Sequence, residues 1–175
     1  MKNRVFAAFF LFTLLIGQIV AQGGSDLDKL DEMFSRYFEK VMPAWKHERV
    51  EPIVKTENVL IQFWSFSNRK VKISIIPRKS TEEARDVLHR YAKYESKKEQ
   101  LTDVGDEAYA SGYGFSDVAF RRGRLTIYVR ATADVDSDPD ARTLSQSERF
   151  EREKSEMRRL SREFARHAVK AIDTQ

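Results

Sequence analysis

The residues of this sequence with the clearest chemical potential are four carboxylates that alternate along one segment: Asp134, Asp136, Asp138 and Asp140. Alternating aspartates on a turning loop resemble the opening of a calcium site, because hard cations take clustered oxygen ligands. The rest of that pattern is missing. Pro139 stands where a glycine makes the sharp turn, and Ser145 replaces the final bidentate glutamate. We therefore interpret the segment as a solvated acidic loop before a helix and predict no metal site.

No other combination of residues indicates catalysis. His47, His89 and His167 are far apart on a predicted loop and two predicted helices, so their spacing does not suggest a zinc site. Asp106 and Glu107 are paired carboxylates, but adjacent strand residues point to opposite faces and cannot share a site as acid and base. A nucleophile elbow, a phosphate-binding glycine loop and a dinucleotide fingerprint are all missing. We predict a non-enzymatic protein with no cofactor.

Aromatic residues on the predicted strands form the first candidate for a binding surface. Trp64, Phe66, Tyr109 and Tyr128 are expected to line the sheet face that points away from the main helix layer. Such a face beside the glycines of residues 112–114 would suit a flat or apolar ligand. The alternative is that a helix covers these side chains and that they belong to the core.

A basic ridge on the last predicted helix forms the second candidate. It consists of Arg159, Arg162, Arg166 and Lys170, which recur at helical spacing. Guanidinium and ammonium groups in such a row can bind an acidic partner or a phosphate-bearing surface. Glu163 interrupts the ridge, however, and an ordinary solvated helix face is the alternative.

The first half of the chain contains the elements that must position these residues. Apolar residues at helical spacing predict a helix over residues 27–41, which Pro43 ends. Three strands follow at residues 50–56, 58–66 and 69–77. The last two are separated by Ser67 and Asn68, which favour a tight turn, so we predict a hairpin there.

The second half repeats this order. Ser80 and Glu83 form a capping box that begins a second helix, and the polar residues 93–100 end it loosely. Short strands are predicted at residues 107–111, 117–121 and 124–132, followed by a long helix over residues 145–172. The predicted order is α-βββ-α-βββ-α. Hairpin-linked strands of this kind predict an α+β fold with one mostly antiparallel sheet of about six strands and three helices packed on it.

One motif carries a resemblance to known proteins. Residues 105–109 read Gly-Asp-Glu-Ala-Tyr, and residues 118–129 read as an apolar strand, a basic turn with Gly123 and a second apolar strand. This pattern resembles uncharacterised exported bacterial proteins, and at the level of fold it resembles the small PsbP-like and Mog1-like α+β domains. The resemblance covers residues 101–172. It implies an exported accessory or binding domain, and it brings no catalytic residue.

The N-terminus indicates a compartment. Lys2 and Arg4 precede an apolar run over residues 5–16, and the small residue Ala21 follows, as in a signal peptide cut after Ala21. The run is shorter than the roughly 20 residues that span a bilayer. We therefore predict a leader over residues 1–21 and a single domain over residues 22–175, periplasmic or secreted, without stable membrane insertion after cleavage.

Composition limits the partners further. The chain has 31 Lys and Arg and 27 Asp and Glu, and removal of the leader lowers the basic count to 29. Such a balanced charge gives no argument for binding nucleic acid. The sequence contains no cysteine, which excludes disulfides and thiolate sites. We predict a binding domain whose partner is an envelope protein or another envelope component. The alternative is a small-molecule or lipid carrier that uses the aromatic sheet face.

Overall fold

The computed structural model describes residues 25–52 and 58–174. These residues form three α-helices: α1 (Ser25–Val41), α2 (Thr81–Tyr94) and α3 (Gln146–Asp173). They also form seven strands: β1 (Lys46–Val50), β2 (Leu60–Phe66), β3 (Arg69–Pro77), β4 (Glu99–Leu101), β5 (Glu107–Ser111), β6 (Asp117–Arg122) and β7 (Leu125–Ala133). Three short 3-10 helices complete the order: η1 (Tyr113–Phe115), η2 (Val135–Ser137) and η3 (Pro139–Thr143). The predicted leader lies outside the described residues.

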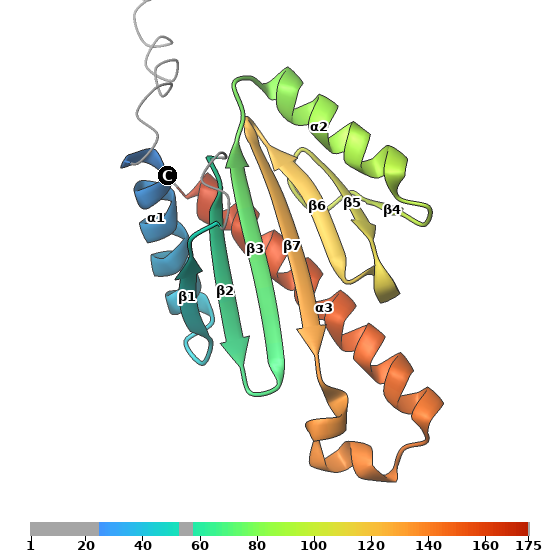
Figure 1. Cartoon of the computed structure of the whole chain (residues 1–175). Helices are drawn as coiled ribbons and strands as arrows, with labels where there is room; N and C mark the ends of the chain where they lie inside the picture. The colour runs from blue at the N-terminus through green and yellow to red at the C-terminus, as the bar shows by residue number, and fades with distance from the viewer. Residues whose placement is uncertain (1–24, 53–57, 175) are drawn as a thin grey trace, which may run out of the picture.

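All seven strands form one antiparallel sheet in the order β1-β2-β3-β7-β6-β5-β4 (Figure 1). Strands β1 to β3 form one meander and β4 to β7 form another. The two meet in the middle of the sheet, where β3 pairs with β7 along its whole length. The α+β class, the three helices and the antiparallel sheet were predicted correctly from the sequence, but the sheet has seven strands and not six.

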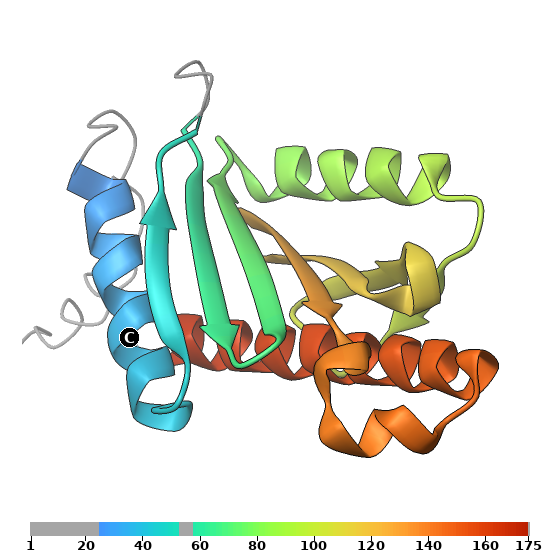
Figure 2. The same ribbon diagram turned by 60° about the horizontal axis from the view of Figure 1, so that its bottom comes forward.

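The helices lie on opposite faces of the sheet (Figure 2). Helices α1 and α3 cover one face, here called the inner face, while α2 packs on the other, here called the outer face, over β6 and β7. The core lies under the inner helices. It contains Phe34 and Phe38 of α1, Phe164 of α3 and Trp64 of β2, all fully buried. Because full burial of one such side chain contributes about 1.5–3 kcal/mol, this core can hold a domain without disulfides.

The structure differs from the predicted strands in two places, one displaced strand and one strand that was not predicted. The first strand lies at β1, Lys46–Val50, earlier than the predicted residues 50–56, of which 53–56 lie outside the described part. It forms there because Lys46 to Val50 pair with Ser65 to Ile61 of β2. The other difference is β4, an edge strand that was missed because Glu99 and Gln100 are polar and solvent-exposed.

The helix ends follow from local hydrogen bonds. Ser80 caps α2 by accepting a hydrogen bond from the backbone of Glu83, 3.1 Å away. The Glu83 carboxylate accepts from the backbone of Lys79 at 2.9 Å, one residue before the position that a capping box would require. Ser145 and Glu148 form a complete capping box at α3.

Among the described residues, we find no helix with the length and apolar character needed to cross a membrane.

Candidate functional site

Two rows of side chains cross the centre of the outer face. The strand register places Phe63, Lys72, Arg130 and Asp117 side by side in one row, and Ile61, Ser74, Tyr128 and Ala119 in the next. Helix α2 covers the β6 end of these rows, so Ala119 is fully buried. The outer face of β1 and β2 carries no helix in the described part of the chain (Figures 1 and 2). Apolar and basic side chains therefore lie there partly open to solvent.

A groove forms where α2 meets these rows. Its volume is about 210 Å³, and its polar and aromatic lining consists of Lys72, Ser74, Tyr91, Asp117, Tyr128 and Arg130. The rings of Tyr91 and Tyr128 lie edge to face with centroids 5.4 Å apart. Tyr91 Oη is 2.7 Å from Ser111 Oγ, a hydrogen bond that fixes the ring of Tyr91 in the wall. We call this site the outer groove.

The charges around the outer groove are unequally paired. Arg130 donates two hydrogen bonds to the Asp117 carboxylate, with N–O distances of 2.9 and 2.6 Å. Lys72 has no hydrogen bond or ion pair within the described residues, and its Nζ lies 6.0 Å from the centre of the Phe63 ring. The lining thus contains a neutralised pair and one unpaired cation. An anion entering the groove would meet Lys72 without breaking a hydrogen bond or an ion pair of this side chain.

Burial sets the protonation of the tyrosine in the wall. Desolvation raises the pKa of Tyr91 above its ordinary value, and the hydrogen bond with Ser111 opposes this only in part. Tyr91 is therefore neutral at physiological pH. The hydrogen bonds to Asp117 raise the pKa of Arg130, which remains a cation. The groove presents aromatic rings, hydroxyl groups and positive charge, which is a lining suited to binding and contains no activated nucleophile.

The four predicted ligand-binding aromatics do not share a face. Trp64 is fully buried on the inner face, where its ring lies 5.1 Å from Phe38 of α1. Phe66 lies on the same side at the end of β2, 43% exposed, with its ring 6.0 Å from Trp45. Tyr109 and Tyr128 lie on the outer face. The expectation of one aromatic surface is corrected accordingly, and only Tyr128 lines the outer groove.

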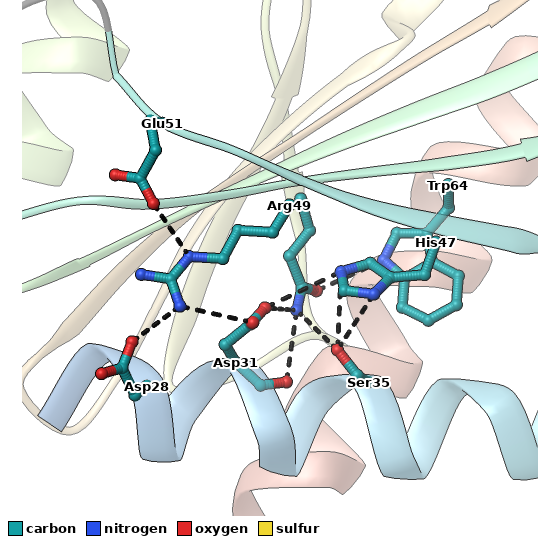
Figure 3. A network of polar contacts seen from close by, with 8 residues as sticks. Asp28, Asp31, Ser35, His47, Arg49, Glu51 and Trp64 are labelled. Atoms are coloured by element: carbon teal, nitrogen blue, oxygen red, sulfur yellow. Dashed lines mark hydrogen bonds and ion pairs between the residues drawn. The ribbon is translucent and has the colours of Figure 1, made fainter. Parts of the chain in front are cut away.

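Helix α1 is attached to the sheet by a polar network (Figure 3). Gln62 is fully buried and donates to the Asp31 carboxylate at 2.6 Å, while its own carbonyl oxygen accepts from Trp64 Nε1 at 3.3 Å. His47 stacks on Trp64 at 4.7 Å between centroids, with Nε2 3.7 Å from Asp31. Ser35 Oγ lies 3.3 and 3.5 Å from the two ring nitrogens of His47.

Ser35, His47 and Asp31 contain the residue types of a catalytic triad, but their geometry differs. In a triad, serine and carboxylate bond opposite nitrogens of the histidine. Here both nitrogens are about equally far from Ser35, and Nε2 also faces Asp31. Ser35 Oγ in addition accepts a hydrogen bond from the Gln62 amide, 3.2 Å away. The network therefore fixes α1 to β1 and β2, and nothing in its geometry activates Ser35.

In the motif that carried the family resemblance, hydrogen bonds join the turn before β5 to the turn between β6 and β7. Asp106 accepts hydrogen bonds from the backbone of Gly123 at 2.8 Å and from Arg122 at 2.7 Å. Glu107 faces away from it, towards α2, and contacts His89 at 2.7 Å and Tyr109 at 2.9 Å. These contacts lower the pKa values of both carboxyl groups, although burial opposes the shift in each case. Asp106 serves the turn, and Glu107 is salt-bridged.

The predicted basic ridge on α3 is largely occupied by partners within the chain. Arg162 contacts Glu99 of β4, and Arg166 contacts Asp103 beyond it, each at 2.7 Å. Arg159 contacts Glu156 and Glu163 on its own helix. Lys170 is exposed and has no ion pair within the described residues. The ridge therefore holds the short edge strand β4 against α3, which limits what it can offer to a partner.

The acidic loop is likewise engaged with neighbouring side chains. Asp138 lies 3.0 Å from the Asn68 amide and 3.6 Å from Arg69, and Asp136 contacts Arg149 at 3.1 Å. The described residues contain no group of three or more histidine, aspartate or glutamate side chains placed to hold a metal ion. His167, the remaining histidine, lies 3.3 Å from Tyr37 Oη.

Sequence reasoning missed the outer groove as a unit. Period-two alternation does place Lys72 and Ser74 on one face of β3, and Tyr128 and Arg130 on one face of β7. It does not show that β3 and β7 are neighbours or that Tyr91 of α2 closes the site. In comparisons with known proteins, no family model, no curated protein and no solved structure matches this chain.

Proposed function

We propose that this protein is an exported, non-enzymatic binding module that engages a component of the cell envelope through its outer face. The observation that carries the proposal is the uncovered part of that face. Ile61 and Phe63 are half-buried there, and Lys70 and Lys72 have no ion pair within the described residues. Apolar surface rimmed by charge is typical of interaction sites. The N-terminal pattern of a leader supports the location in the envelope.

The second function predicted from the sequence, a small-molecule or lipid carrier, is favoured only in its small-molecule form. The outer groove contains a pair of tyrosine rings beside a lysine. Its volume of about 210 Å³ is below the range of about 300–1,000 Å³ typical of pockets for drug-sized ligands. Trp64, which was expected to line such a site, is in the core.

Position-dependent photocrosslinking in the producing cells tests the binding module. A photoreactive residue replaces Phe63 on the outer face, and in a matched control it replaces Arg85, which is exposed on α2. We expect a defined adduct from position 63 that position 85 does not give. The captured protein, once purified, should bind the mature domain, and Phe63→Asp should weaken that binding at least about tenfold, whereas Arg85→Asp should not. Equal adducts at both positions, or none at position 63, would contradict the proposal.

A further inference from the structure

We infer that the outer groove binds a small organic carboxylate attached to a single flat ring, with the carboxylate at Lys72 and the ring against Tyr128. The inference rests on the outer face being a binding surface, as proposed above, but it depends neither on export nor on a protein partner. Its first support is the shape of the groove. A volume of about 210 Å³ suits one ring with a short polar group.

The charge of the lining selects an anion. Lys72 and Arg130 are cations and Asp117 is an anion, so the net charge is positive. Arg130 and Asp117 satisfy each other through two hydrogen bonds. Lys72 is the lining charge without a hydrogen bond or ion pair within the described residues. A ligand carboxylate can accept a hydrogen bond from the Lys72 ammonium group. Such a charge-assisted hydrogen bond is about twice as strong as a neutral one.

The aromatic wall selects a flat body. The rings of Tyr91 and Tyr128 pack edge to face against each other. The hydrogen bond between Tyr91 and Ser111 holds the Tyr91 ring in place, and a fixed wall reduces the entropy lost on binding. Offset-stacked or edge-to-face packing of a ligand ring is the arrangement that aromatic pairs prefer. Ser74 contributes a hydroxyl group from the floor of the groove.

Ligand-observed NMR on the purified mature domain tests the inference. The probes are benzoate and phenylacetate, their neutral amides benzamide and phenylacetamide, and the cation benzylamine. We expect both carboxylates to bind at least about tenfold more tightly than their amides, because only they form the charged contact. Amide resonances of β3 and β7 in the wild-type protein should shift on titration. A domain that binds none of the probes, or binds amides as tightly as carboxylates, would overturn the inference.

Two lysines on one strand supply a matched pair of variants. Lys72→Met removes the ammonium group from the groove, whereas Lys70→Met removes one from the same face of β3 outside the lining. We expect Lys72→Met to weaken carboxylate binding at least about tenfold without affecting the amides, and Lys70→Met to change neither. Tyr128→Leu should weaken both classes. Equal effects of the two lysine variants would disprove the assignment. Because the assay contains no protein partner, its failure would leave the crosslinking result unaffected.

Discussion

At the scale of single residues, the amide of Gln62 is a polar group that the fold needs in its place. It is fully buried, yet both its donor and its acceptor are used, by Asp31 and Trp64 respectively. A buried polar group costs little when it is hydrogen-bonded and much when its partner is removed. Gln62 therefore fixes the contact between α1 and the sheet more specifically than an apolar residue of the same size.

Replacing this residue tests its role. Gln62→Leu keeps the volume but leaves Trp64 Nε1 buried without an acceptor, so we expect a loss of about 1–3 kcal/mol in the free energy of unfolding. The matched control is Gln100→Leu on the exposed edge strand β4, for which we expect a change within about 0.5 kcal/mol. Urea unfolding followed by circular dichroism measures both. Equal stability of the two variants would show that the network contributes nothing.

Glu156 links stability to pH. Hydrogen bonds from Arg159 and Arg69 lower the pKa of Glu156 from 4.5 to about 2, although partial burial opposes the shift. A carboxyl group whose pKa is lower in the folded than in the unfolded protein stabilises the fold at pH values above its unfolded pKa. This contribution is lost as the pH falls towards the folded pKa. We expect about 1 kcal/mol, after allowance for solvent screening, to be lost between pH 4.5 and pH 2.

The variant Glu156→Gln isolates this contribution. Its free energy of unfolding should fall less steeply than that of the wild type over the same acidic interval, when urea midpoints are measured at several pH values. Glu153→Gln is the control on the same helix, because Glu153 has no ion pair within the described residues. It should keep the slope of the wild type. Identical slopes for all three proteins would refute the assignment.

At the scale of elements, the turn before β5 depends on a close approach of two backbones. Gly105 has a φ of 59°, and a Cβ at this position would overlap the carbonyl oxygen of Arg121 on β6. Gly123, in the turn between β6 and β7, has a similar φ of 55° but open space around it. Both glycines relieve left-handed strain, and only Gly105 also makes room for another strand.

This difference predicts unequal costs for one chemical change. Gly123→Ala should destabilise the protein by about 1 kcal/mol, the lower end of the penalty for a left-handed alanine. Gly105→Ala carries the same conformational penalty and adds a clash with the backbone of Arg121. We therefore expect it to lower the free energy of unfolding by at least about 3 kcal/mol. Thermal and urea unfolding of the two variants give the comparison. Similar losses of stability in the two variants would mean that β5 and β6 can move apart locally without a loss in the free energy of unfolding.

At the scale of the whole molecule, the two faces of the sheet have different roles. The inner face is covered along its length by α1 and α3 and contains the large aromatic core. On the outer face, α2 packs over β6 and β7 and contacts Glu107 and Ser111 of β5, whereas the described residues place no helix over β1 and β2. The proposed binding through the outer face therefore leaves the aromatic core on the inner face undisturbed.

The proposed export makes a prediction about the mature chain. We expect the protein recovered from the envelope or the medium to begin at Gln22, as measured by intact mass and N-terminal sequencing. Ala21→Leu places a bulky residue before the cut and should leave the leader attached, whereas Gln18→Ala should be processed normally. An uncleaved chain confined to the cytoplasm would argue against export.

The type and order of most elements follow from local patterns in the sequence. Val71, Ile73 and Ile75 alternate with polar residues, and all three are buried on the inner face, because a pleated strand alternates its side chains whatever lies beside it. The helices were equally predictable from their apolar spacing. Strand β4 could not be predicted from the local pattern, because Glu99 and Gln100 are polar. They form a strand by pairing with the edge of β5.

Only the tertiary structure decided which residues of different strands share a face. Trp64 and Tyr128 both read as strand aromatics, yet register places Trp64 in the core and Tyr128 in the outer groove. A shift of one residue in pairing exchanges the faces of a whole strand, so spacing within each strand cannot fix the relation between strands. The outer groove exists because β3 pairs with β7 and α2 packs over β6 and β7, and both are long-range contacts.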